Sequence, residues 1–116
     1  MENLVFVYGT LRKGECNHYL LDGSECLGVS KTQPVYALFD LGSYPGLSEG
    51  DSSVIGEVYR IDLKTLARLD LLEEIPIVYR RETLVTPYGV AWIYLYQDTS
   101  SLTNRISSGD WCSRML

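Results

Sequence analysis

The chain is poor in the side chains that most often bind metals or form disulfides. Its 116 residues include one histidine, His18, and three cysteines, Cys16, Cys26 and Cys112. An odd number of widely spaced cysteines does not indicate a disulfide framework, and a single histidine leaves a Cys/His metal site short of ligands. Cys16 and His18 are a nucleophile and a base in principle, but close sequence neighbours rarely face each other usefully. We therefore expect no metal site, and we expect His18 to be a packing residue.

Basic residues are also few. Ten Lys and Arg against fifteen Asp and Glu give a net charge of −5, with an isoelectric point near 4.7. The basic residues occur singly or as pairs such as Arg12-Lys13 and Arg80-Arg81, so no nucleic-acid footprint is present. An acidic protein can still bind a small anion, because local N–H groups can outweigh the overall field.

Long apolar segments are missing as well. Residues 1–3 contain no basic side chain, and the apolar run that follows covers only residues 4–7. A membrane span needs roughly 20 apolar residues, and a signal peptide begins with a basic region. We expect a cytoplasmic protein with no membrane association. No repeat or linker is present, so we expect one domain over residues 1–116, and nothing indicates an obligate partner, which favours a monomer.

The most informative stretch is LVFVYGTLRKG, residues 4–14. Its first four residues predict a strand buried on both faces, which ends where Tyr8, Gly9 and Thr10 interrupt the apolar run. A strand that ends at a glycine leaves backbone N–H groups without a ladder partner, and such groups can bind a carboxylate or a carbonyl. Without a Cβ, Gly9 would let a ligand approach the backbone. The alternative is an ordinary turn.

The remaining apolar segments, bounded by Gly and Pro, predict further strands and two helices. We expect strands over 26–29, 35–41, 54–60, 78–85 and 90–96, and helices over 17–23 and 62–72. Asn17 is the expected N-cap of the first helix. Residues 43–47 are expected to be a turn, because Pro45-Gly46 fits the centre of a type II turn. Alternation in the last strand places two sets of residues on opposite faces: Trp92, Tyr94 and Tyr96, and Ala91, Ile93 and Leu95.

Five or six strands with hairpin-length connections after residue 78 favour an α+β fold. We expect a small mixed, largely antiparallel sheet flanked by short helices. A sheet of this size with several glycine bends can curl into a small barrel.

The second helix carries the most interesting acids. Asp62 is its expected N-cap, Pro76 ends it at or just after Glu74, and its core-facing stripe is expected to contain Leu63, Leu66, Ala67 and Leu71. Asp70, Glu73 and Glu74 then cluster at its carboxyl end, where the helix dipole disfavours anions. That field and partial burial would raise a carboxyl pKa toward the range of proton transfer. The alternative is a solvated acidic helix end.

Several motifs together resemble the γ-glutamylcyclotransferase-like family, especially its small γ-glutamylamine cyclotransferase and bacterial YtfP-like branch. The first is Tyr8-Gly9-Thr10-Leu11, preceded by an apolar strand and followed by Arg12-Lys13-Gly14 and Asn17-His18. Others follow along almost the whole chain: Tyr44-Pro45-Gly46, Gly56-Glu57-Val58-Tyr59, Leu69-Asp70-Leu71-Leu72-Glu73, Tyr79 with Arg81, Trp92 with Tyr94 and Tyr96, and Gly109-Asp110-Trp111.

The resemblance implies a small barrel of mixed strands and a cofactor-free reaction on a small γ-glutamyl substrate. In active members, the loop after the first strand binds the γ-glutamyl group through its backbone, and one glutamate serves as acid and base. Carried over to this chain, the loop consists of Tyr8, Gly9, Thr10 and Leu11, and the glutamate is Glu73.

The hypothesis is therefore a cyclotransferase that forms 5-oxoproline and a free amine from a γ-glutamyl amine or peptide. Two alternatives remain: a non-catalytic small-molecule binding module with the same barrel, and a related acyl-transfer enzyme with another γ-glutamyl carrier. Family membership alone does not guarantee activity, because function resides in the site. The amine side of the substrate does not follow from the sequence.

Overall fold

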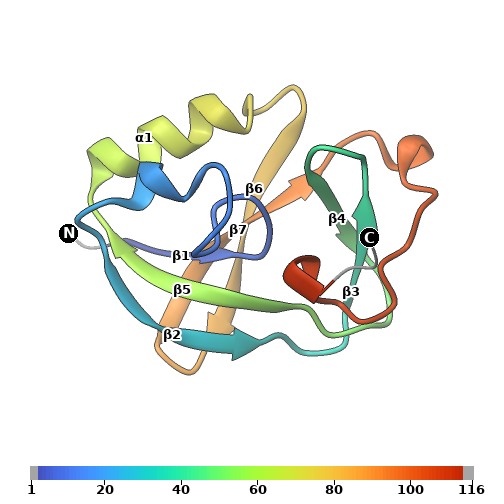
Figure 1. Cartoon of the computed structure of the whole chain (residues 1–116), viewed down its shortest axis with the longest axis horizontal. Coiled ribbons are helices and arrows are strands. Elements are labelled where there is room, and N and C mark those ends of the chain that lie inside the picture. The colour runs from blue at the N-terminus through green and yellow to red at the C-terminus, as the bar shows by residue number, and fades with distance from the viewer. Residues whose placement is uncertain (1–2, 114–116) are drawn as a thin grey trace.

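The computed structural model describes residues 3–113 as two sheets and one α-helix with short 3₁₀ turns (Figure 1). The larger sheet has five strands in the order β2-β5-β1-β7-β6. These strands are β1 (Asn3–Val7), β2 (Glu25–Lys31), β5 (Ile55–Ile61), β6 (Tyr79–Thr86) and β7 (Gly89–Tyr96). The smaller sheet pairs β3 (Tyr36–Asp40) with β4 (Pro45–Glu49). The helices are α1 (Leu63–Leu72), η1 (His18–Leu21), η2 (Thr99–Ser101) and η3 (Trp111–Ser113).

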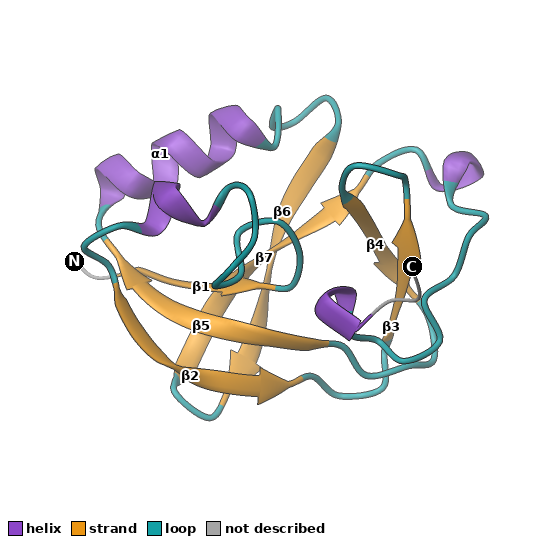
Figure 2. Cartoon of the chain, viewed as in Figure 1, coloured by secondary structure: helices purple, strands orange, loops and turns teal. Residues whose placement is uncertain are grey.

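The larger sheet is mixed, as the sequence predicted. β1 pairs antiparallel with β5 and parallel with β7, while β2–β5 and β6–β7 are antiparallel. The sheet curls but does not close, because β2 and β6 are its two edges and β3 and β4, which lie apart in Figure 2, pair with each other. The α+β class with its largely antiparallel sheet is therefore confirmed, and the shape is a curled open sheet rather than a barrel. A bulge between Cys26 and Gly28 interrupts the register of the edge strand β2.

Two hydrophobic cores lie on the two faces of the larger sheet. The first contains Val5 and Val7 of β1 together with Leu66 and Leu69 of α1. The second contains Phe6 of β1, residues of β3 and β4, and Trp111 near the end of the chain. The predicted alternation of β7 is confirmed: Trp92, Tyr94 and Tyr96 belong to the first core, and Ala91, Ile93 and Leu95 belong to the second. β1 is thus buried on both faces, as its apolar run predicted.

The predicted turn at Pro45-Gly46 is wrong, because these residues begin β4. The chain reverses before Pro45, at residues 41–44. Gly42 has a φ of +103°, and the Leu41 N–H donates to the Tyr44 carbonyl at 3.0 Å. Pro45 then pairs with Asp40 as the first strand residue, a position that proline tolerates. A glycine that accepts positive φ was a better turn position than the Pro-Gly pair that follows it.

The helix α1 begins as predicted, because the Asp62 side chain accepts a hydrogen bond from the Thr65 N–H at 2.7 Å. The predicted core stripe is wrong apart from Leu66. Leu63 is 64% exposed and Leu71 is 78% exposed, whereas Leu69 is fully buried. Leucines occur on both sides of this helix, so apolar spacing alone did not fix which side faces the sheet. Leu66 and Leu69 lie on the inner face of the helix, and Glu73 follows Leu69 by four residues, about one helical turn.

No helix in residues 3–113 is long and apolar enough to cross a membrane. The longest, α1, has 10 residues.

The orientation of α1 gives a matched stability test. Leu69→Ala should lower the free energy of unfolding by about 2–5 kcal/mol, the usual cost of a buried Leu→Ala cavity. Leu71→Ala makes the same chemical change two residues later at an exposed position and should alter stability by less than about 0.5 kcal/mol. Urea unfolding followed by circular dichroism measures both values. A larger cost for Leu71→Ala than for Leu69→Ala would contradict this orientation.

Candidate active site

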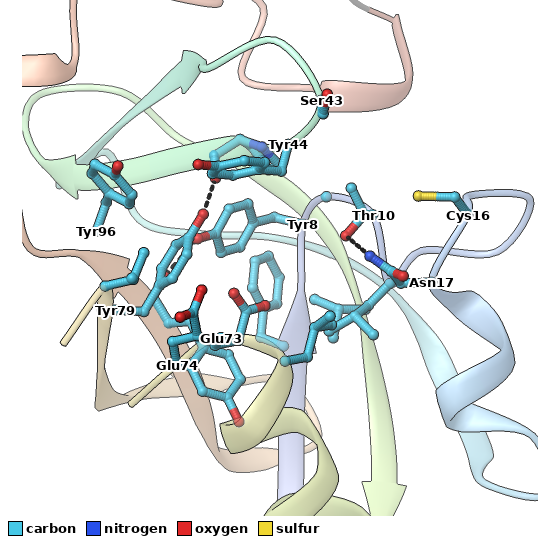
Figure 3. Close-up of a pocket in the computed structure, with 18 residues that line it drawn as sticks. Tyr8, Thr10, Cys16, Asn17, Ser43, Tyr44, Glu73, Glu74, Tyr79 and Tyr96 are labelled. Atoms are coloured by element: carbon cyan, nitrogen blue, oxygen red, sulfur yellow. Dashed lines mark hydrogen bonds between the residues drawn. The ribbon is translucent and has the colours of Figure 1, made fainter. Parts of the chain in front are cut away.

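The structure contains a cavity of about 420 Å³ between the end of β1, the start of β4 and the end of α1 (Figure 3). Its walls come from residues 6–11, 16–17, 43–45 and 72–74, and Val78 with side chains of β6 and β7 completes them. The site thus combines segments far apart in the sequence.

All five residues predicted from the sequence line this one cavity: Tyr8, Gly9, Thr10, Leu11 and Glu73. The neighbouring Glu74 also lines it, while Asp70 lies outside the lining. Figure 3 shows Glu73 below Tyr8, with Thr10 at another end of the cavity. The structure therefore brings together the 8–11 loop (Tyr8, Gly9, Thr10 and Leu11) and the carboxylate that the sequence singled out.

The 8–11 loop is held through its carbonyl groups. The Gly9 carbonyl accepts from the Arg12 N–H at 3.0 Å, and the Thr10 carbonyl accepts from the Asn17 N–H at 2.9 Å. The Leu11 carbonyl is hydrogen-bonded to Nδ1 of His18 at 2.9 Å. The N–H groups of Gly9, Thr10 and Leu11, in contrast, donate to no acceptor within residues 3–113. Three consecutive residues of the cavity wall thus have backbone donors available to a ligand.

The reason for glycine at position 9 differs from the prediction. A Cβ on Gly9 would lie 2.3 Å from Cγ and 2.8 Å from Cδ of Pro45. The space without a side chain is therefore filled by the proline ring of β4, and it is not left open for a ligand. The Pro45 carbonyl in turn accepts a hydrogen bond from the Tyr79 hydroxyl at 2.5 Å. This contact joins the 8–11 loop, β4 and β6 around the cavity.

A buried ion-pair network holds the chain just after the loop. Nε of Arg12 lies 3.1 Å from Oε2 of Glu57, and its Nη1 lies 2.6 Å from Oδ1 of Asp110. Oε1 of Glu57 accepts from the Lys13 N–H at 3.0 Å and from the Tyr59 hydroxyl at 2.9 Å. Burial raises the pKa of Asp110, but hydrogen bonds from Ser113 and Arg12 outweigh it and keep the pKa below its usual value. The motifs around Glu57 and Asp110 therefore fasten the loop.

Glu73 is the C-cap residue of α1, where its backbone N–H donates to the Leu69 carbonyl. Its side chain is partly buried, and no hydrogen bond or ion pair in the described part of the chain involves its carboxylate. Burial, and after it the nearby charge of Asp70, raises the pKa of Glu73 to about 7. The sequence predicted a raised pKa at this helix end, and the larger cause is burial.

Asp70 has the opposite environment. It accepts a hydrogen bond from the Tyr94 hydroxyl at 2.7 Å and lies 3.3 Å from Nε of Arg81. Arg81 is itself stacked over Trp92, with 4.4 Å between the guanidinium and the ring centroid. Of these two acids, Asp70 interacts with a hydroxyl and a guanidinium group, whereas the Glu73 carboxylate has no partner in the described part of the chain.

Buried tyrosines form much of the cavity wall. The Tyr8 hydroxyl donates to the Tyr94 carbonyl at 2.6 Å. Burial raises the pKa of Tyr8, Tyr79 and Tyr94 well above the usual value, and the hydrogen bond to Asp70 adds to the shift at Tyr94. These hydroxyls are neutral near pH 7 and supply fixed dipoles around the carboxylate.

In the 17–23 segment, Asn17 differs from the sequence analysis and His18 agrees with it. The Asn17 side chain makes no capping hydrogen bond. Its Nδ2 donates to Oγ1 of Thr10 at 2.9 Å, and Asn17 lines the cavity. His18 behaves as the predicted packing residue, because it lies outside the cavity lining and its ring packs against Tyr59 with 5.8 Å between centroids. Cys16 lines the cavity and His18 does not, so the two residues do not form a nucleophile and base in this site. The sequence signal for Asn17 was its place in the first motif.

A curled, open mixed sheet with one α-helix, and a cavity between the end of β1 and the end of α1, make this chain a small α+β protein. The family model described as gamma-glutamyl cyclotransferase, AIG2-like, matches residues 5–113, and the chain belongs to this family.

Similar proteins cover almost the whole chain. A Vibrio cholerae protein is 60% identical over 115 residues, which are 99% of this chain and 100% of its own. The gamma-glutamylcyclotransferase family protein YtfP of Escherichia coli K12 is 44% identical, covering 95% of this chain and 96% of its own. The solution structure of E. coli YtfP superposes with a TM-score of 0.77 over 95% of this chain and 96% of that one. A Niallia circulans protein named gamma-L-glutamyl-butirosin B gamma-glutamyl cyclotransferase is 38% identical, covering 96% of this chain and 76% of its own.

The raised pKa of Glu73 predicts how stability depends on pH. The pKa is about 7 in the folded protein against an ordinary value of 4.5, so between these values the folded state holds a proton that the unfolded chain has released. The free energy of unfolding should therefore fall as pH rises through this window. Glu73→Gln should remove that fall, while Glu74→Gln, which keeps Glu73, should retain it. Urea unfolding at pH 4.5, 6 and 8 measures the effect, and equal pH dependence in the wild type and Glu73→Gln would contradict the assigned pKa.

Proposed function

We propose that the protein is a cofactor-free cyclotransferase that converts a γ-glutamyl amine or peptide into 5-oxoproline and a free amine. One observation carries the proposal: the Glu73 carboxylate, with a pKa of about 7, borders the same cavity as the unpaired N–H groups of Gly9, Thr10 and Leu11. The name of the Niallia circulans relative, a γ-glutamyl cyclotransferase of γ-L-glutamyl-butirosin B, supports this class of reaction.

The nucleophile of this reaction is already in the substrate. The α-amine attacks the γ-carbonyl carbon, a C–N bond closes the five-membered ring, and the bond from that carbon to the leaving nitrogen breaks. Glu73 accepts a proton from the α-ammonium group and delivers one to the leaving nitrogen. The second proton lost by the attacking nitrogen also ends on the amine, which is released as an ammonium ion. No serine or cysteine nucleophile is needed.

The rest of the cavity would orient the substrate and stabilise charge. Folding the flexible γ-glutamyl chain into ring geometry is an orientation effect that can lower the barrier by several kcal/mol. The negative charge that develops on the γ-carbonyl oxygen needs preorganised donors, and the N–H groups of the 8–11 loop are suited to this task because they have no other partner. Tyr79 and Tyr94 remain neutral near pH 7, so they add no further charge beside Glu73.

The role of Glu73 is tested by Glu73→Gln, which keeps the shape and removes the proton acceptor. Turnover of γ-glutamyl amines should fall by about 10²–10⁴-fold, the usual contribution of a general acid–base residue. Release of 5-oxoproline from a panel of γ-glutamyl amines and peptides measures it. Glu82→Gln, which removes an exposed carboxylate outside the cavity lining, is the matched control and should keep full activity.

Three results would contradict this assignment. Near-wild-type turnover by Glu73→Gln would show that Glu73 is not the base. Loss of turnover in Glu74→Gln alone would move the role to Glu74, which lines the same cavity. Binding of 5-oxoproline by the wild type without turnover of any panel member would favour the non-catalytic binding module.

The pKa of Glu73 also predicts the pH profile. Because the deprotonated carboxylate accepts the first proton, kcat/KM should rise with pH and level off above about 7. Asp70→Asn removes the neighbouring charge that contributes to the raised pKa, so the rising limb should move to lower pH. A limb that stays in place in Asp70→Asn while the variant remains folded would exclude Glu73 as the titrating group.

A further inference from the structure

The backbone of Glu74 has a conformation that usually belongs to glycine. Its φ is +51°, and within residues 3–113 it is the only non-glycine residue with a positive φ. It directly follows the C-cap Glu73, and its N–H donates to the Leu71 carbonyl at 3.2 Å. The Ile75 N–H donates to the Asp70 carbonyl at 3.1 Å, which completes a Schellman motif. Glycine is the usual residue at this position, because a Cβ makes the conformation unfavourable.

The charge of Glu74 does not offset this local strain. Its carboxylate makes no hydrogen bond or ion pair within residues 3–113. It also follows the carboxyl end of α1, where the helix dipole disfavours an anion. The residue is exposed and yet lines the cavity, so its carboxylate lies at the cavity mouth. A ligand in the cavity is the partner that this free charge can have.

All charged side chains that line the cavity are acidic. Among the described residues, the lining contains Glu73 and Glu74 but no lysine, arginine or histidine. Figure 3 shows Glu74 on the Tyr79 side of Glu73, with Thr10 at the opposite end. Tyr79 and Tyr96 wall the end near Glu74, with 5.1 Å between their ring centroids. The end of the cavity remote from the 8–11 loop therefore combines a free carboxylate with aromatic rings.

We infer that Glu74 selects γ-glutamyl substrates whose leaving amine carries a second, cationic group. The inference rests on the proposed function and deepens it. With the γ-glutamyl group at the 8–11 loop and the scissile bond within reach of Glu73, the leaving amine extends toward Tyr79 and Glu74. A carboxylate there attracts an ammonium group, and tyrosine rings attract a cation to their faces. The substrate class is thus the γ-glutamyl amides of diamines and polyamines, and Glu74 determines specificity without moving a proton.

The test compares two γ-glutamyl amides that differ in one terminal group. The amide of 1,5-diaminopentane ends in an ammonium group, and the amide of hexylamine ends in a methyl group of similar size. Release of 5-oxoproline gives kcat/KM for each amide, and the ratio of the two values measures the preference for the cation. The wild type should prefer the ammonium probe. Glu74→Gln should lower the ratio about three- to fivefold, the size expected for a partly exposed ion pair.

The matched control is Glu82→Gln, which removes an exposed carboxylate outside the cavity lining and should keep the wild-type ratio. Glu74→Lys should lower the ratio below that of Glu74→Gln, because its charge repels the ammonium group. Glu74→Gly removes the side chain and the strain together, so it should lower the ratio and raise the urea midpoint of unfolding. Added salt should reduce the wild-type ratio, because an exposed ion pair is screened.

Each result decides one question. An unchanged ratio in Glu74→Gln, with turnover of both amides, refutes the cation preference and leaves the proposed function in place. Equal losses of kcat/KM for both amides also refute it, because they assign Glu74 to the reaction itself. A lower urea midpoint for Glu74→Gly would show that the side chain serves the fold and would overturn the inference. If the wild type releases 5-oxoproline from neither amide, the inference fails, and the panel of γ-glutamyl compounds shows whether the proposed function fails with it.

Discussion

The cavity depends on one contact, that of the Pro45 ring with the backbone of Gly9. The ring fills the volume where any other residue would carry a Cβ, so β4 can lie directly against the turn that follows β1. Tyr79 then reaches the Pro45 carbonyl from β6. Through this contact three segments distant in sequence meet around one hollow, while the Arg12 network anchors the other side of the loop to β5 and the C-terminal segment. The amide donors of the loop remain unpaired because its carbonyls hold the turn.

The position of Glu73 follows from the orientation of α1. Leu66 and Leu69 pack against the sheet, and this places the helix end over the cavity. Burial raises the pKa of the Glu73 carboxyl group, and Asp70 adds to the effect. Asp70 interacts with Tyr94 and Arg81, so two acids three residues apart differ in their contacts. The difference comes from what surrounds them, because both carry the same functional group on the same helix.

The sequence correctly predicted those elements whose residue pattern is compatible with only one local structure. The run of β1, the alternation of β7 and the cap at Asp62 all recur in the structure. Because α1 has leucines on two sides, either side could have faced the core. Tertiary packing buries the side with Leu66 and Leu69, which the apolar spacing did not favour. Pro45-Gly46 satisfied turn chemistry locally, yet Gly42 makes the reversal. The site residues were predicted from the order of the family motifs along the chain. The Gly9–Pro45 contact joins residues far apart in sequence, and the Asn17–Thr10 hydrogen bond depends on side-chain geometry, so neither could be predicted from local sequence patterns.

The open sheet has a consequence for the behaviour of the protein in concentrated solution. Its two edge strands each offer unpaired backbone groups, which are templates for edge-to-edge aggregation. β6 carries the charged run Arg80, Arg81 and Glu82 after its first residue, and β2 begins at Glu25 and ends at Lys31, with a bulge between Cys26 and Gly28. Charges and a bulge of this kind discourage another strand from docking, because pairing would bury ionic groups and mismatch the register. The sheet can thus stay open around the cavity while charges and a bulge act against strand pairing at its two edges.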